Sequence, residues 1–178
     1  MEYGNAITKD TLRDVLEQTP DTPANRELRS RITQLIAQRT ITPVPYTYNA
    51  VWNTAGANNN LAAGAVNVVQ NINVQADADF LVLYQTYTAN QLNAAFLSGT
   101  VPIPNISLLM TNTGSGYQYM DQATPIANIF GDGRQPFVLP NPLLWQAKAT
   151  IQLQATNFDA AAGYNLRLSF HGVKLTPF

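Results

Sequence analysis

Residues Ala147 to Leu175 read AKATIQLQATNFDAAAGYNLRLSFHGVKL and carry the clearest strand pattern in the chain. Apolar and polar side chains alternate over residues 149–156 and again over residues 164–171. A period of two over eight residues predicts a strand with one buried face, so two strands are expected. The Asn, Asp and Gly residues between them suit a turn, and an antiparallel hairpin is the simplest pairing.

This predicted hairpin is not stable alone. Burying its five large inward side chains contributes at most about 10 kcal/mol. Ordering roughly two dozen backbone residues costs about 1–2 kcal/mol for each residue. A second apolar layer from the preceding chain is therefore required.

Residues 41–178 contain further short apolar segments separated by turn residues, without a sustained alternation of helices and strands. We expect an extended linker at 42–45, a loop at 55–65 and one or two helical turns at 89–97. Further strands are expected at 46–50, 66–75, 79–88, 106–111, 117–120 and 137–139. About eight short strands predict a mainly β protein, an antiparallel two-sheet sandwich that is jelly-roll-like.

Residues 1–40 have a different character and form an N-terminal α-helical arm in this interpretation, with the sandwich in residues 41–178. Short helices are expected at Asp10–Gln18 and Ala24–Arg39, and Thr22 followed by Pro23 suits the start of the second. Its apolar stripe is too narrow for a helix surrounded by core, so we expect the arm to make assembly contacts. The expected partner-binding residues are Leu28, Ile32, Leu35, Ile36, Arg26, Arg29, Arg31 and Arg39.

The arginines of the second helix are opposed only by Glu27, which leaves a local charge of +3. One interpretation is a solvated face with a few ion pairs. A second is docking onto an acidic protein surface, and a third is nucleic-acid contact, although no aromatic interleaving or recognition motif accompanies the arginines.

The distribution of charge separates the arm from the body. Residues 1–40 hold 12 of the 21 charged side chains, which leaves nine for residues 41–178. The body therefore covers itself with Asn, Gln, Thr and Ser, as a packing surface does. With a net charge of −1 and no long apolar run, we expect neither a nucleic-acid partner nor a membrane segment.

The candidate catalytic residues have simpler structural interpretations. Asp77 and Asp79 are neighbours at the start of one predicted strand, whereas a glycosidase pair flanks its sugar from different strands. His171 is the only histidine, the chain has no cysteine, and Ser169 lies in no nucleophile elbow. We expect no enzymatic activity, no metal and no cofactor.

The aromatic residues leave two interpretations open. Tyr117, Tyr119 and Trp145 could form a sugar-binding platform, or they could pack in the core and at interfaces.

The stretch from Pro136 to Leu175 has a proline-flanked apolar segment, a Gln- and Thr-rich strand ending in an Asn turn, and then YNLRLSFHGVKL. It resembles the C-terminal part of small structural proteins of tailed bacteriophage virions. These are jelly-roll proteins of the cement or decoration kind, with related head and collar proteins.

The resemblance implies a non-enzymatic capsid cement or decoration protein that stabilises the phage head through arm and sandwich contacts. Its implied partners are the major capsid protein or other virion proteins and further copies of itself, as a dimer or trimer. Its implied location is the virion, assembled in the host cytoplasm. The alternative is a receptor- or carbohydrate-binding jelly-roll module of a phage fibre or collar.

Overall fold

The computed structural model describes residues 16–18, 20–37, 41–52, 61–91 and 103–177. The helices are α2 (Pro23–Ala37) and α3 (Ile126–Ile129). The strands are β1 (Ile41–Trp52), β2 (Val68–Asn73), β3 (Asp79–Gln91), β4 (Ile106–Asn112), β5 (Tyr117–Gln118), β6 (Thr124–Pro125), β7 (Phe137–Trp145), β8 (Thr150–Asn157) and β9 (Tyr164–Pro177).

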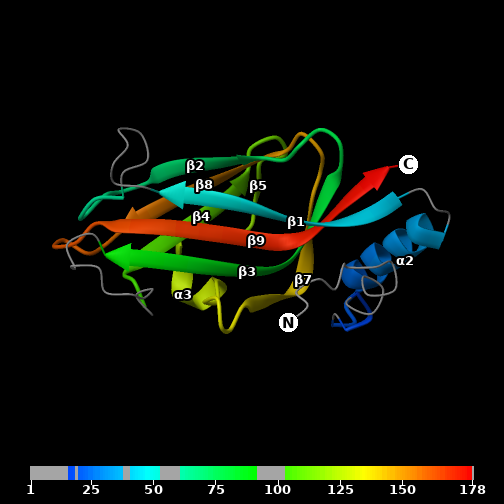
Figure 1. Cartoon of the computed structure of the whole chain (residues 1–178), viewed down its shortest axis with the longest axis horizontal. Helices are drawn as coiled ribbons and strands as arrows, with labels where there is room; N and C mark the ends of the chain where they lie inside the picture. Colours follow the sequence, from blue (N-terminus) through cyan, green and yellow to red (C-terminus); the bar gives the residue numbers. More distant parts are fainter. Residues whose placement is uncertain (1–15, 19, 38–40, 53–60, 92–102, 178) are drawn as a thin grey trace, which may run out of the picture.

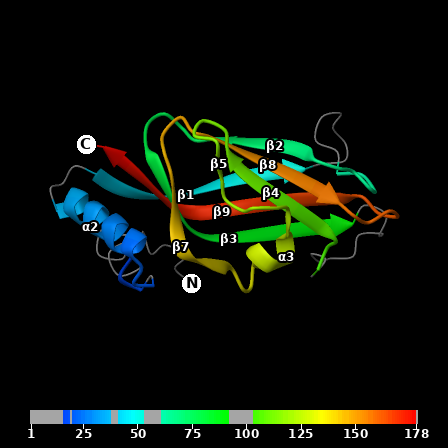
Figure 2. The ribbon, with the colours of Figure 1, turned by 180° about the vertical axis from the view of Figure 1, so that it is seen from behind.

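The strands form two antiparallel sheets packed face to face (Figures 1 and 2). The front sheet, nearer the viewer in Figure 1, has the order β1-β9-β3-β7. The back sheet has the order β2-β8-β4-β5, with β6 also paired to β4. From β1 to β4, and again from β7 to β9, consecutive strands alternate between the sheets, as in a jelly roll. The predicted mainly β, two-sheet, jelly-roll-like sandwich is confirmed.

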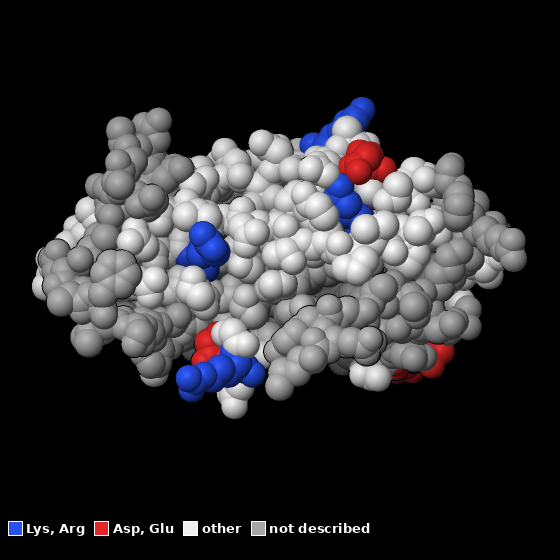
Figure 3. Space-filling model, viewed as in Figure 1, with Lys and Arg blue, Asp and Glu red and all other residues white. Residues whose placement is uncertain are grey.

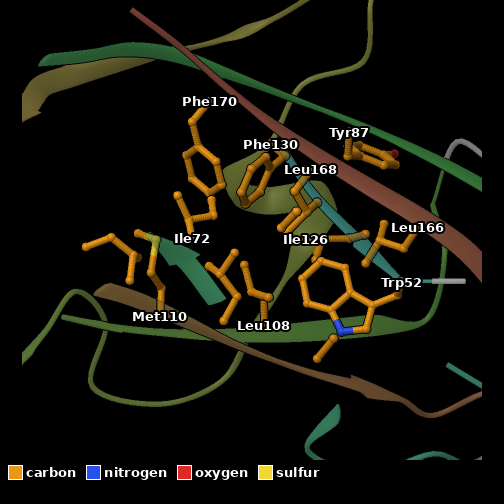
Figure 4. Close-up of a cluster of buried hydrophobic side chains, with 14 of the residues drawn as sticks. Trp52, Ile72, Tyr87, Leu108, Met110, Ile126, Phe130, Leu166, Leu168 and Phe170 are labelled. Atoms are coloured by element: carbon orange, nitrogen blue, oxygen red, sulfur yellow. The ribbon is translucent and has the colours of Figure 1, made fainter. Parts of the chain in front are cut away.

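The core lies between the two sheets. Ile151 and Leu153 of the back sheet are fully buried, as are Leu168 and Phe170 of the front sheet. Figure 4 shows apolar side chains from both sheets meeting, with Phe130 after α3 lying beside Phe170 at a ring-centroid distance of 5.4 Å. The faces predicted from the alternation along the two C-terminal strands are therefore the buried faces.

The predicted hairpin of the two C-terminal strands is wrong. β8 pairs with β2 and β4, whereas β9 pairs with β1 and β3, so the two strands lie in opposite sheets. Six residues, 158–163, join them, more than the two to five of a typical hairpin loop. The connection crosses the roughly 10 Å between packed sheets. Each strand thereby covers the other's apolar face, which a hairpin would leave exposed.

Side chains at both ends hold this connection in place. The Asn157 Nδ2 donates to the carbonyl oxygens of Ala62 and Ala162, each at 2.8 Å. The Asp159 carboxylate accepts hydrogen bonds from the Ala162 amide and, at 2.9 Å, from the Tyr164 hydroxyl. The sequence signal for a turn was therefore correct, although the turn joins two sheets and not two neighbouring strands.

Other predicted boundaries shift in ways that strand pairing explains. The predicted linker at residues 42–45 is the start of β1, because its backbone pairs with the end of β9. β7 continues beyond the predicted segment 137–139 and contains Pro140 and Pro142. Prolines are tolerated there because β7 is an edge strand.

The helical turns expected at 89–97 do not begin at Ala89, because residues 89–91 continue β3. The rest of that segment lies outside the described residues. The same holds for most of the helix expected at Asp10–Gln18 and for residues 55–60 of the expected loop.

Helix α2 packs on the outer face of the front sheet, near the end at which β9 finishes (Figure 1). Its start is as predicted, with Pro23 as the first residue and the Thr22 Oγ1 accepting the Asn25 amide at 3.2 Å. The outer cluster, as we name it, consists of Leu16, Ile32, Ile41, Leu81, Leu83, Val173 and Leu175. α2 therefore covers one end of the front sheet of its own chain.

Candidate functional site

The helix arginines expected to meet a partner divide into three groups. Arg26 and Arg29 both reach Asp21 Oδ1, at 3.4 and 3.3 Å, and the Asp21 side chain is 72% exposed. Such exposed pairs contribute little to stability and are those expected of a solvated face. Arg31 is exposed, and Arg39 lies outside the described residues.

The apolar residues of the same expected interface are also separated. Ile32 is only 2% exposed because it packs in the outer cluster, and Leu28 packs partly buried against that cluster. The side chains of Leu35 and Ile36 lie outside those that the structure describes. Contact with another chain remains a prediction, and Arg26 and Arg31 are the exposed described residues that test it.

The two body carboxylates that resembled a catalytic pair have separate structural partners. Asp77 Oδ2 lies 3.0 Å from the Nζ of Lys174, whose hydrogen bond lowers the pKa of this carboxyl. Asp79 Oδ1 accepts the backbone amide of Ala147 at 2.8 Å. One carboxylate neutralises a buried amine and the other ties β3 to the connection after β7.

His171 lies on the outer face of the front sheet, where it links three strands. Its Nδ1 is 3.1 Å from the Thr47 hydroxyl on β1, and its Nε2 is 3.0 Å from the Thr86 hydroxyl on β3. The ring stacks on Tyr84 at a centroid distance of 4.6 Å, and burial lowers the pKa of the imidazole. The Ser169 hydroxyl donates to Asn49 Oδ1 at 2.7 Å, so its proton is not directed at the imidazole.

The aromatic residues considered for sugar binding do not form one group. Trp145 is fully buried, and its ring lies 4.9 Å from Phe170 and 5.8 Å from Phe80. A ligand cannot reach this ring without opening the core, so of the two interpretations left open for Trp145 the structure supports core packing and contradicts the sugar platform. Tyr117 is 62% exposed and meets Tyr119 edge to face, with centroids 5.1 Å apart.

The two tyrosines line a groove of about 410 Å³ between the edge strands β5 and β7. Apolar contact is supplied by β7 through Pro142 and Leu143, and polar contact by side chains that include Gln146. Sequence patterns identified the tyrosines as a feature of the β4–β5 hairpin. They could not identify the other wall, because only the closing of the sandwich brings β7 beside β5.

Local chemistry sets the shape of the tyrosine side of the groove. The turn between β4 and β5 contains Gly116 at a φ of +69°, a conformation that L side chains rarely adopt. The Asn112 Oδ1 accepts the amides of Gly114 and Ser115, at 3.1 and 3.4 Å. Tyr117 therefore directly follows a turn of defined conformation, and its side chain is exposed.

Comparisons with known proteins add little to this geometry. No family model and no curated protein matches the sequence. Among solved structures, the chain is similar to one described as the crystal structure of serine protease of Aeromonas sobria, at 9% identity and a TM-score of 0.34. The match covers 82% of this chain but spans only 30% of that one, and at this TM-score it carries no argument. In the part of the chain that the structure describes, no helix has the length and apolar character needed to cross a membrane.

Proposed function

We propose that this protein is a non-enzymatic structural component of a tailed-phage virion, a cement or decoration protein bound to the assembled head. Its proposed partners are the major capsid protein or other virion proteins, together with further copies of the same chain in a dimer or trimer. Its proposed location is the virion, after assembly in the host cytoplasm.

The observation that carries the proposal is the sparse charge on the sandwich. Only nine charged residues fall in residues 41–178, and on the face shown in Figure 3 the coloured charged groups are few and scattered. A free soluble domain typically carries about 25% charged residues, and this chain carries 12%. A neutral surface rich in Asn, Gln and Thr suits close packing against neighbouring proteins, because few charges must be desolvated. The jelly-roll strand order adds support, since this fold is frequent in viral capsids.

The proposed mechanism is stabilisation by mass action. A protein that binds only the assembled shell favours that shell by RT ln(1 + [L]/Kd), about 2.7 kcal/mol per site at 100 times Kd. Many weak sites on a symmetric lattice then reinforce one another through avidity.

Deletion of the arm is an unsuitable test, because α2 packs on the outer cluster. Deleting residues 1–40 would uncover Leu81, Leu83 and Val173 of the outer cluster, and the exposed apolar patch would itself alter folding and association. Charge reversal at the exposed residues Arg26 and Arg31 leaves that cluster intact, so these positions separate binding from folding.

The experiment measures association of the purified protein with phage particles that lack it, by co-sedimentation and by electron microscopy of the labelled particles. We expect the wild-type protein to bind at regular positions on the head and to delay heat release of the genome. The variant R26E/R31E should bind more weakly while keeping the wild-type melting temperature. Arg134→Glu, on the exposed loop between α3 and β7, is the matched control and should bind normally.

One result would contradict the whole proposal, and another would contradict only its arm contact. Absence of the protein from purified virions would contradict the virion role itself. Undiminished association of R26E/R31E would reject the arm as the contact and leave the sandwich as the remaining proposed surface.

A further inference from the structure

The groove between β5 and β7 has the size and chemistry of a small-molecule site. Its volume of about 410 Å³ lies within the range of about 300–1,000 Å³ typical of small-molecule sites. None of the described residues that line it is Asp, Glu, Lys, Arg or His. A charged ligand would lose its hydration there without gaining a counterion, so the groove favours a neutral one.

The walls combine aromatic rings with neutral polar groups. Tyr117 presents an exposed ring, and Tyr119 meets it edge to face at a ring-centroid distance of 5.1 Å. Burial raises the pKa of Tyr119, while polar contacts from the Asn112 and Trp145 side chains to its hydroxyl oxygen act in the opposite direction. Tyr119 therefore keeps its hydroxyl proton at neutral pH and can donate a hydrogen bond.

The opposite wall disfavours a peptide strand. A peptide would add to the free edge of β7, but Pro140 and Pro142 have no backbone N–H to donate. The other edge, β5, is only two residues long. Recognition in this groove must therefore come from side chains, and the exposed amide of Gln146 and hydroxyl of Ser115 are available for it.

We propose that this groove binds a neutral saccharide, with one sugar face stacked on Tyr117 and its hydroxyls bonded to Tyr119, Gln146 and Ser115. A sugar matches this combination of groups, because C–H groups on one face of its ring lie against an aromatic surface while the hydroxyls at its edge form hydrogen bonds. The site does not depend on the proposed virion role, and either proposal can fail without the other.

The test titrates the full-length, ¹⁵N-labelled protein with maltotriose, cellotriose and chitotriose, up to about 10 mM to detect weak binding. We expect at least one of these neutral sugars to shift the amide resonances of Tyr117, Tyr119 and Gln146 in a saturable manner. The charged sugar 3′-sialyllactose should bind more weakly than its neutral counterpart lactose. A proline-rich decapeptide tests the competing class of ligand and should cause no shift.

Variants then test whether saccharide binding depends on the Tyr117 ring. Tyr117→Ala should raise Kd roughly tenfold or more, as loss of an aromatic anchor does, whereas Tyr117→Phe should stay within about threefold of wild type. Phe158→Ala is the matched control, since Phe158 is also an aromatic residue and is 58% exposed. It lies away from the groove, because its backbone amide donates to the carbonyl oxygen of Asn105, just before the start of β4. Unchanged dispersion of the other amide resonances confirms that each variant is folded.

Three outcomes would overturn the inference. The first is the absence of saturable shifts with every neutral sugar tested. The second is binding of the decapeptide alone, which would make the groove a peptide site. The third is equal weakening by Tyr117→Ala and Phe158→Ala, which would mean that the sugars do not use this groove.

Discussion

The Nζ of Lys174 lies 3.0 Å from Asp77 Oδ2, although the lysine side chain is 7% exposed and the aspartate side chain is 57% exposed. The same amine donates to Gln75 Oε1 and lies 4.5 Å from the centroid of the Tyr46 ring. A buried ammonium group is costly unless it is paired, so Asp77 is the group that makes this position tolerable.

Removing the carboxylate partner should therefore destabilise the protein more than removing the buried lysine charge itself. We expect Asp77→Asn to lower the melting temperature more than Lys174→Met, because the first leaves an unpaired buried cation. Thermal unfolding at pH 7 in low and high salt checks this order. A larger loss for Lys174→Met would show that the pair itself contributes more than the burial of the amine costs.

His171 should make stability depend on pH in the weakly acidic range. Burial lowers its pKa below the usual value near 6.5, so the unfolded chain binds a proton at a higher pH than the folded chain. Stability should be fully present above about pH 7 and should fall as the pH drops from 6.5 through the lower folded pKa. Urea unfolding at pH 7.5, 6.5 and 5.5 measures this slope.

The matched variant for that titration is His171→Gln, which can still hydrogen-bond to Thr47 and Thr86 but does not titrate. The slope between pH 7.5 and 5.5 should be smaller in this variant than in the wild type. An equal slope in both proteins would assign the pH dependence to other groups.

Gly172 marks a close approach between β9 and β3. A Cβ atom placed there would lie 1.9 Å from the carbonyl oxygen of Leu81, in the middle of the paired backbone. Gly172→Ala should lower the free energy of unfolding by at least about 1–3 kcal/mol, because the backbone of both strands must shift. Gly133→Ala is the control, since its Cβ would meet no atom within 4 Å, and chemical denaturation of both variants checks the difference.

Ile32 anchors α2 to the outer cluster. Because Ile32 is 2% exposed, Ile32→Ala should reduce the free energy of unfolding by about 2–5 kcal/mol if the helix and sandwich unfold together. Ser30→Ala on the exposed face should change it by no more than about 0.5 kcal/mol. An unchanged midpoint for Ile32→Ala, with faster amide exchange confined to α2, would show that the helix detaches independently of the sandwich.

The site was only partly predictable from sequence. The Tyr117 and Tyr119 side of the groove follows a recognisable Asn- and Gly-rich turn, so the pair could be singled out. Trp145 belongs to the same set of candidates only as an aromatic residue in a proline-rich segment. An isolated aromatic residue has no periodic pattern around it from which its burial could be predicted. Its burial depends on Phe80 and Phe170, which belong to other strands.

Local sequence patterns are enough to predict which face of each C-terminal strand is buried and where α2 begins. Both follow from local rules, since alternation assigns Ile151 and Leu168 to a core and the Thr22–Pro23 pair suits a helix start. The placement of β8 and β9 in opposite sheets, and the packing of α2 on its own front sheet, could not be predicted in this way. Strand edges offer the same backbone hydrogen bonds to any partner, so the pairing is selected by the arrangement that covers every apolar face at once.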